Sequence, residues 1–120
     1  MSTAPERCLL VSDAMAAASA ADGEYRLGPM AVRVREGVAR LVDTGGIAGS
    51  TLTLDRAVRF MVEEVGVSTA HALRSATAVP AAVLGRTDLG TLDEGARADL
   101  VVLDDALHVM RVMRGGAWQR

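Results

Sequence analysis

Lysine is absent from this 120-residue chain, whose 13 basic residues are all arginine. Chemistry that passes through a lysine Schiff base is therefore excluded. The chain has one cysteine, Cys8, so no disulfide can form within it, and a reducing compartment is the simplest expectation. Cys8 stands in an apolar run with only Arg7 as a cationic neighbour, so we expect a small buried side chain rather than a nucleophile.

Long apolar runs and basic clusters are missing as well. No stretch approaches the roughly 18 apolar residues of a membrane span, and no apolar segment of the signal-peptide kind is visible. The formal net charge is −2, and the arginines are scattered along the sequence. We therefore expect a soluble, cytoplasmic protein with no nucleic-acid and no membrane partner.

Aromatic residues are scarce, with one Trp, one Tyr and one Phe, although half of the residues are apolar. The interior must then be filled by Ala, Val and Leu, and such small side chains bury little area each. The length suits one domain with a modest core.

The first apolar segment ends in a carboxylate. After a loose lead-in over residues 1–6, the continuous apolar run Arg7–Ser12 predicts a strand covered on both faces, as in a parallel sheet. Asp13 ends this strand, and the Ala- and Ser-rich residues 14–23 predict a loop with at most a helical turn.

A hairpin is predicted next. Alternating residues indicate a strand over Met30–Arg35, with its valines on one face and its arginines on the other. Glu36 and Gly37 make the turn to a second strand over Val38–Val42. The following residues, 43–50, form a Gly-rich loop.

Three helices and a set of antiparallel strands follow. Apolar spacing predicts a helix over Leu54–Val65, then one from the N-cap Ser68 to about Ala78, and a short one over Pro80–Gly85. Residues 99–104 predict a strand, and residues 108–120 a hairpin around two glycines. One buried strand of the parallel type cannot make a parallel sheet, which indicates a part of something larger.

Several stretches resemble one enzyme family. They are "LVSDAMAAASAADGEYRLG", "REGVARL", "GGIAGSTLTLDRAVR", "ALRSATAVPAAVLGR" and "LGTLDEGARADLVVLD". They run from Arg7 to Trp118 and resemble the C-terminal third of the N-acetylglucosamine-6-phosphate deacetylases, in the amidohydrolase superfamily. The last two stretches are specific only to the superfamily, whereas "VSDAM" followed by "AGSTLTLDRAVR" is specific to the deacetylases.

The resemblance implies an α/β fold class: the C-terminal fragment of a metal-dependent (β/α)8 barrel, with its last strand and closing helices, plus part of a small β-sandwich. Residues 1–90 would supply the barrel part and the inserted hairpin, and residues 91–120 the sandwich strands. The family's divalent metal, zinc or iron, is held by a glutamate and histidines on earlier strands. No metal is therefore expected on this chain alone.

Asp13 is the candidate catalytic residue. The resemblance implies that its carboxylate is the general base and acid in the hydrolysis of N-acetylglucosamine 6-phosphate to glucosamine 6-phosphate and acetate. From the residues alone, a strand-end aspartate that accepts bonds from the amides of Ala14 and Met15 is the commoner interpretation. The surrounding "LVSDAM" favours the catalytic one.

The candidate substrate contacts are Ile47, Ala48 and Gly49, which the resemblance places against the sugar through main-chain groups. The plain alternative is a flexible linker between hairpin and helix. His71 and His108 are 37 positions apart without a recognised ligand spacing, so both are expected to be structural or surface residues.

Two further groups of charged residues receive the simpler interpretation. Asp99, Asp104 and Asp105 suggest a cation site, but turn and strand-end chemistry explains them equally. Arg33 and Arg35 would suit a phosphate, but the alternation places them on a solvated face.

Two hypotheses of different classes remain. In the first, the chain is the C-terminal portion of a deacetylase and is inactive alone. In the second, it is a non-catalytic remnant or a split-enzyme subunit, whose partner would be a separate N-terminal half or a second copy of the chain.

Overall fold

The computed structural model describes residues 7–120, so the predicted lead-in over residues 1–6 lies outside the described residues. The described residues form two compact units. One consists of residues 11–54, and the other of residues 7–10 and 55–120. Strands and helices both occur, which confirms the predicted α/β class at this coarse level. In chain order the elements are β1 (Gly23–Leu27), β2 (Met30–Arg35), β3 (Val38–Leu41), α1 (Leu54–Glu63), α2 (Thr69–Ala76), α3 (Ala78–Val83), β4 (Leu100–Leu103), β5 (Val109–Arg114) and β6 (Ala117–Trp118).

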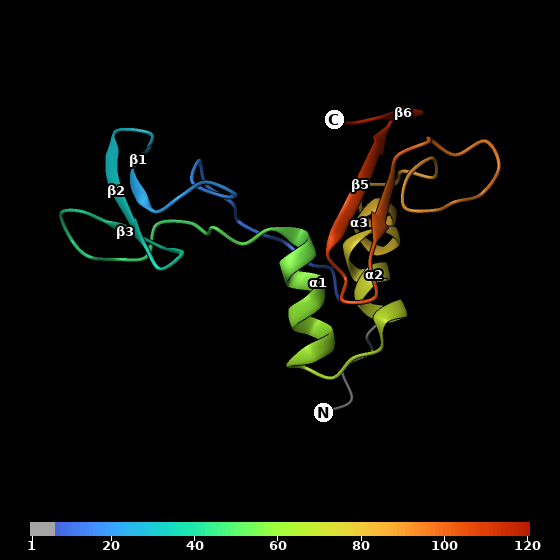
Figure 1. Ribbon diagram of the computed structural model, residues 1–120, viewed down its shortest axis with the longest axis horizontal. Helices are drawn as coiled ribbons and strands as arrows, with labels where there is room; N and C mark the ends of the chain where they lie inside the picture. The colour runs from blue at the N-terminus through green and yellow to red at the C-terminus, as the bar shows by residue number, and fades with distance from the viewer. Residues whose placement is uncertain (1–6) are drawn as a thin grey trace. The chain divides into compact units, whose positions relative to one another are not determined.

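The unit of residues 11–54 is built on the antiparallel sheet β1-β2-β3 (Figure 1). Its second hairpin is the predicted one, with both turn residues, Glu36 and Gly37, at positive φ of 51° and 72°. Such a turn matches the twist of the flanking strands. The Asp22 carboxylate accepts bonds from the backbone N–H groups of both turn residues and so holds the turn against the start of β1.

Strand β1 was not predicted. Its exposed and half-buried residues alternate along Gly23–Leu27, and it pairs with β2 over its full length. The Gly28–Pro29 pair is the local signal for a turn between β1 and β2. Gly28 has a φ of 57°, and the ring of Pro29 suits the second central position of a tight turn.

One face of this sheet carries a small core. The side chains of Val32, Val34 and Ala39 are 0%, 2% and 2% exposed. They pack with Met15 and Ala17, which precede β1 in the chain, and with Ala48, which follows β3. Tyr25, Leu27 and Leu41 flank this cluster. The predicted division of β2 into a valine face and an arginine face is confirmed, since Arg33 and Arg35 are exposed.

The helices of the second unit begin and end close to the predicted positions. Helix α1 buries Ala57 and Val58, and Gly66, at a φ of 77°, follows its last turn. Ser68 is the N-cap of α2, where its hydroxyl accepts a bond from the backbone N–H of His71 at 3.3 Å. Helix α3 begins at Ala78, two residues earlier than predicted.

The last third of the chain forms the antiparallel sheet β4-β5-β6. The predicted hairpin is present, and its turn residues Gly115 and Gly116 have φ values of 56° and 81°. The backbone N–H of Gly115 donates to the Asp99 carboxylate at 2.6 Å, which confirms a strand-end role for this residue. The guanidinium of Arg111 lies 3.8 Å from the ring centroid of Trp118 on the neighbouring strand.

The first apolar segment differs from its prediction. No strand is assigned to residues 8–13, because a strand needs a ladder partner and no described strand pairs with this segment. It is anchored instead by two backbone bonds of 2.9 Å, from the Leu10 N–H to the Ser75 carbonyl and from the Ser50 N–H to the Asp13 carbonyl. The prediction of a buried Cys8 is wrong, since its side chain is exposed, as is that of Val11 at 70%. No helix among the described residues is long and apolar enough to cross a membrane.

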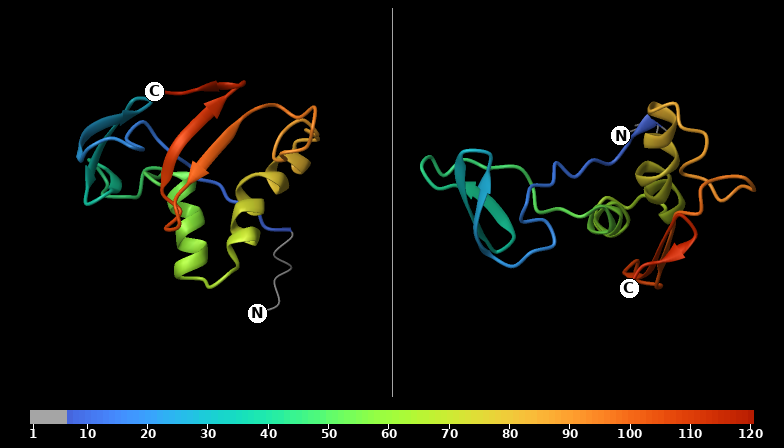
Figure 2. Two further views of the ribbon diagram at one scale, coloured as in Figure 1. Left: turned by 45° about the vertical axis from the view of Figure 1, so that its right-hand side comes forward. Right: turned by 90° about the horizontal axis from the view of Figure 1, so that it is seen from above.

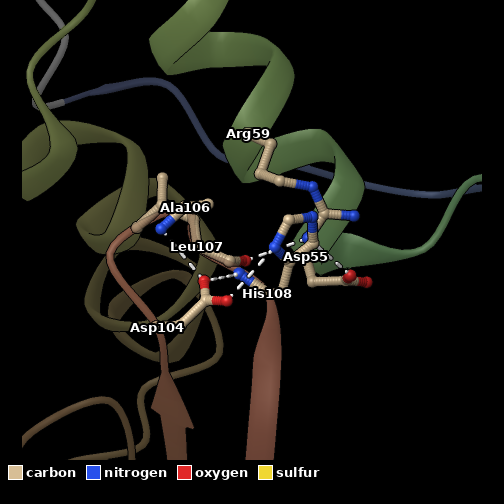
Figure 3. A network of polar contacts seen from close by, with 6 residues as sticks. All are labelled: Asp55, Arg59, Asp104, Ala106, Leu107 and His108. Carbon is tan, nitrogen blue, oxygen red and sulfur yellow. Dashed lines mark hydrogen bonds and ion pairs between the residues drawn. The ribbon is translucent and has the colours of Figure 1, made fainter.

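The β4–β5 turn lies beside α1 (Figure 2), and a polar network joins the two (Figure 3). Arg59 of α1 pairs with Asp55 at 2.9 Å and donates from the same nitrogen to the Leu107 carbonyl at 2.9 Å. Asp104 accepts bonds from the backbone N–H groups of Ala106 and His108 at 3.0 and 2.7 Å, and its other oxygen lies 3.3 Å from His108 Nδ1. The turn is therefore held both by its own carboxylate and by the helix.

Gly90 provides a test of packing in this unit. A Cβ at this position would lie 2.8 Å from both the Ala78 Cα and the Thr77 carbonyl oxygen, and the residue has a φ of 76°. Gly90→Ala should lower the free energy of unfolding by about 2 kcal/mol or more, because backbone strain and a backbone clash add. Gly95→Ala is the matched control: its φ is 87° but its Cβ would meet nothing within 4 Å. In urea unfolding, the free energy of unfolding of the control should fall by only about 1 kcal/mol. Equal decreases in the two variants would contradict the close contact of Gly90 with Thr77 and Ala78.

Asp104 provides a test of the turn. The backbone bond from His108, followed by its side chain, holds the pKa of the Asp104 carboxyl below its ordinary value of 3.8. A depressed folded pKa gives stability that is present above pH 3.8 and is lost as the pH falls through the folded value. Asp104→Asn should therefore unfold more readily than the parent at pH 7, with a difference that shrinks below pH 3.8. An NMR titration in which this carboxyl ionises at or above 3.8 would contradict the assignment.

Candidate functional site

Asp13 lies directly before a backbone pairing between two segments of the same unit. Its own carbonyl accepts a bond from the Ser50 N–H at 2.9 Å, and the Met15 N–H donates to the Ser50 carbonyl at 2.9 Å. These two bonds make Ala14 and Ser50 a parallel bridge. The structure therefore brings Asp13 against the loop that carries the other three predicted site residues, although 33 or more positions separate them.

The loop of residues 47–50 is in turn fixed to β3. Ile47 bridges Arg40 in the antiparallel sense, and the Ala48 N–H donates to the Ala39 carbonyl at 3.0 Å. Ala48 is 4% exposed and belongs to the core cluster, whereas Ile47 is 72% exposed. The loop is therefore an anchored segment and not the flexible linker that its glycines allow.

Gly49 explains how the two segments approach each other. Its φ is 67°, and a Cβ here would lie 3.2 Å from the Met15 Cβ and 3.3 Å from the Asp13 carbonyl oxygen. A side chain at this position would require Met15 or the Asp13 backbone to move by a few tenths of an ångström. Glycine is therefore required both for the backbone angle and for the close approach.

The Asp13 carboxylate itself is accessible. Its side chain is exposed and makes no hydrogen bond or ion pair with any residue in the range 7–120. The amide of Met15 is already used by Ser50, so the alternative in which the carboxylate binds that amide does not hold. Asp13 also has a φ of 50°, and a non-glycine residue in this region is uncommon and indicates a constrained position.

The arrangement offers an exposed carboxylate beside a loop with one exposed apolar side chain. Such a carboxylate can accept a proton from a nearby water and return it to a leaving group.

Ser50 was not identified from the sequence as part of the site. Ser50 makes both backbone bonds of the bridge, and its hydroxyl accepts from the Leu52 N–H at 2.8 Å. Only a pairing between distant segments reveals it, and no local pattern does.

A metal ion does not fit the side chains described here. No group of three or more His, Cys, Asp or Glu among residues 7–120 could hold one. The two histidines have local partners: His71 Nδ1 lies 2.9 Å from the Ser68 hydroxyl, and His108 lies beside Asp104.

Comparison with known proteins gives one family. The amidohydrolase family profile matches residues 9–118. A putative N-acetylgalactosamine-6-phosphate deacetylase of Escherichia coli K12 is 47% identical over 110 residues, which cover 91% of this chain and 65% of that protein. Human N-acetylglucosamine-6-phosphate deacetylase is 39% identical over 118 residues, which cover 96% of this chain and 29% of the human protein.

A solved structure is also similar. It is an aspartate-to-alanine mutant of the Mycobacterium smegmatis N-acetyl-D-glucosamine-6-phosphate deacetylase in complex with N-acetyl-D-glucosamine-6-phosphate. The TM-score is 0.85 at 47% identity, and the match covers 95% of this chain and 31% of that one. The resemblance to these deacetylases that the motifs indicated is confirmed. The chain spans less than two thirds of the length of each of these three proteins.

Gly49→Ala tests the close approach of the loop to Asp13. The added Cβ should shift residues 13–15 slightly relative to Gly49, lower the free energy of unfolding by about 2 kcal/mol because backbone strain and tight contacts add, and shift the NMR signals of Asp13 and Met15. Gly45→Ala serves as the control, since its φ is 73° but its Cβ would meet nothing within 4 Å. Unchanged signals at Asp13 in the first variant would show that the loop does not touch this segment.

Proposed function

Because the chain belongs to the amidohydrolase family, we propose that it supplies the C-terminal part of a hydrolase that removes the acetyl group from an N-acetylhexosamine 6-phosphate, with N-acetylglucosamine 6-phosphate as the first candidate substrate. The observation that carries the proposal is the match of 95% of the chain to a deacetylase whose structure holds this sugar phosphate. The identity of 47% to a putative N-acetylgalactosamine-6-phosphate deacetylase makes the galactosamine epimer the second candidate.

Asp13 is the proposed catalytic residue, and Ile47, Ala48 and Gly49 are the proposed substrate contacts. The reaction is hydrolysis of an amide: a water oxygen attacks the acetyl carbonyl carbon, and Asp13 accepts the proton that the water loses. The C–N bond then breaks, and the same carboxyl returns its proton to the departing nitrogen. The second proton of the water leaves with the acid and passes to the amine, so the products are acetate and the amino sugar phosphate with its nitrogen as ammonium, and atoms and charge balance.

The loop's proposed role is to position the sugar. The Ala48 N–H is already bonded to Ala39, and the Ser50 N–H to Asp13. Among residues 47–50 this leaves the N–H groups of Ile47 and Gly49 and the exposed side chain of Ile47 for a ligand. A rigid loop with few free groups favours one orientation of the acetamide relative to Asp13.

The remainder of the enzyme is proposed to come from residues outside this chain. In the complete fold, residues 7–12 would be the last strand of a (β/α)8 barrel, α1 to α3 its closing helices up to about residue 90, and β4 to β6 part of a small β-sandwich. The zinc or iron of the complete enzyme would be bound by that remainder.

Exposed apolar side chains support this proposal. Val11, Val101 and Met110 are 70%, 57% and 64% exposed, and Val83 and Leu84 at the end of α3 are 67% and 75% exposed. Exposed apolar side chains that gather on a surface are covered where a partner binds, and the adjacent Val83 and Leu84 are the best candidates for such a contact. The partner is accordingly a preceding part of the same enzyme or a separately encoded N-terminal half, with assembly of several copies as a further arrangement.

Complementation tests the proposal. The chain should be co-expressed with the part of the Mycobacterium smegmatis deacetylase that lies outside its 31% match, and zinc should be supplied. Acetate release from N-acetylglucosamine 6-phosphate is expected from the pair and not from this chain alone. Asp13→Asn should lower kcat by roughly 10²-fold or more with little change in KM, because it removes the general base.

Asp43→Asn is the matched control, since within residues 7–120 the Asp43 carboxylate accepts one bond, from the adjacent Thr44 N–H at 2.8 Å, and asparagine can accept the same bond. It should leave the rate unchanged. Preference for the galactosamine epimer would assign the second candidate substrate. Full activity of Asp13→Asn in the assembled pair, or enzyme-like activity of the chain alone, would overturn the proposal.

A further inference from the structure

Four arginines that are spread along the sequence share one face of the β1-β2-β3 sheet. Strand pairing places Arg26 opposite Ala31 and Arg33 opposite Arg40. Because side chains alternate along a strand, these residues and Arg35 all point away from the face that carries Val32 and Val34. They are all exposed, and the only carboxylate of β1 to β3 on this face is that of Glu24.

The arginines on β2 and β3 have too few acidic partners to balance their positive charge. Arg33 and Arg40 are directly opposite each other, an arrangement of like charges that destabilises a sheet. Arg33 has one partner, Glu24, at 2.8 Å, and Arg40 donates to the neutral Gly45 carbonyl at 2.9 Å. Arg35 makes no hydrogen bond or ion pair with any residue of the described range.

These three side chains surround an open hollow. Its volume is about 440 Å³, and its walls include Arg33, Arg35 and Arg40 together with the apolar Val38 and Val42. Glu36 is the one acidic residue in its lining. With Glu24, which pairs with Arg33, three guanidinium groups face two carboxylates, so the hollow keeps an excess positive charge although the chain as a whole has a formal charge of −2.

We propose that this hollow binds a phosphate group, either inorganic phosphate or the phosphate monoester of a small molecule. Guanidinium groups match the oxygens of phosphate in paired hydrogen bonds, and two opposed arginines become favourable when a dianion lies between them. No aromatic residue is in the lining, so the hollow lacks the stacking surface that single-stranded nucleic acids use.

The hollow adjoins the proposed deacetylation site at one edge. Arg40 is paired with Ile47, and paired residues have their side chains on the same face. Met15 and Ala48, which flank Asp13 and the loop, pack on the valine face of the same sheet. The inference is argued from the arginines alone, so it does not rest on the proposed function and survives its failure.

The test is a titration of the full chain, labelled with nitrogen-15, with inorganic phosphate at constant ionic strength. The Nε–H signals of Arg33, Arg35 and Arg40 should shift together and saturate in the millimolar range, and phosphate should raise the melting temperature. Chloride at equal ionic strength should produce neither effect. A parallel titration with N-acetylglucosamine 6-phosphate identifies the source of the phosphate, since tighter binding than inorganic phosphate assigns a sugar phosphate.

Matched variants distinguish phosphate binding in the hollow from nonspecific attraction to the positive face. Arg35→Gln and Arg40→Gln should each weaken phosphate binding by about tenfold, because each removes a charge-assisted pair of bonds. Arg26→Gln removes the same charge from the same face, but this residue is outside the lining of the hollow and donates to the Pro29 carbonyl at 3.0 Å. It should weaken binding less than twofold.

Three results would overturn the proposal: no saturable shift with phosphate on the parent chain, the same shift with chloride, or equal weakening by Arg26→Gln. The parent titration decides the matter even if a variant fails to fold.

Discussion

The candidate site depends on the pairing of residues 13–15 with Ser50. Two backbone hydrogen bonds of 2.9 Å join segments that are far apart in sequence, and Gly49 permits the approach because it has no Cβ. Without this pairing Asp13 would be an exposed loop residue. With it, the carboxylate is held at a constrained backbone angle next to a loop that is itself fixed to β3. The constraint is local to one small unit and needs no other part of the chain.

The same unit shows how a sheet with a very small core can support two different surfaces. Alternation places the valines of β2 against Met15, Ala17 and Ala48, which fixes the loop beside Asp13. The same alternation gathers the arginines on the other face, where they lack sufficient acidic partners. One period-two pattern therefore packs Ala48 of the candidate site on one face and concentrates positive charge, next to Ile47, on the other.

The sequence predicted those elements whose signals are local. The Glu36–Gly37 and Gly115–Gly116 turns need positive φ at both positions, and the Ser68 cap precedes an amphipathic helix, so each was found. Strand β1 was missed because its five residues follow a long Ala-rich loop and depend on β2 for pairing. Cys8 and the segment around it were mispredicted because burial depends on a covering partner, which the described residues do not provide. The choice of Asp13 came from the resemblance, while its contact with Ser50 required the structure.

Hydrogen exchange of the Met15 and Ser50 backbone amides tests the central claim most directly. In the paired arrangement both amides are bonded across the bridge, so they should exchange slowly and lose their protection together. If either amide exchanged at the rate of an unpaired loop under native conditions, Asp13 would not be held beside residues 47–50, and the site as described here would not exist.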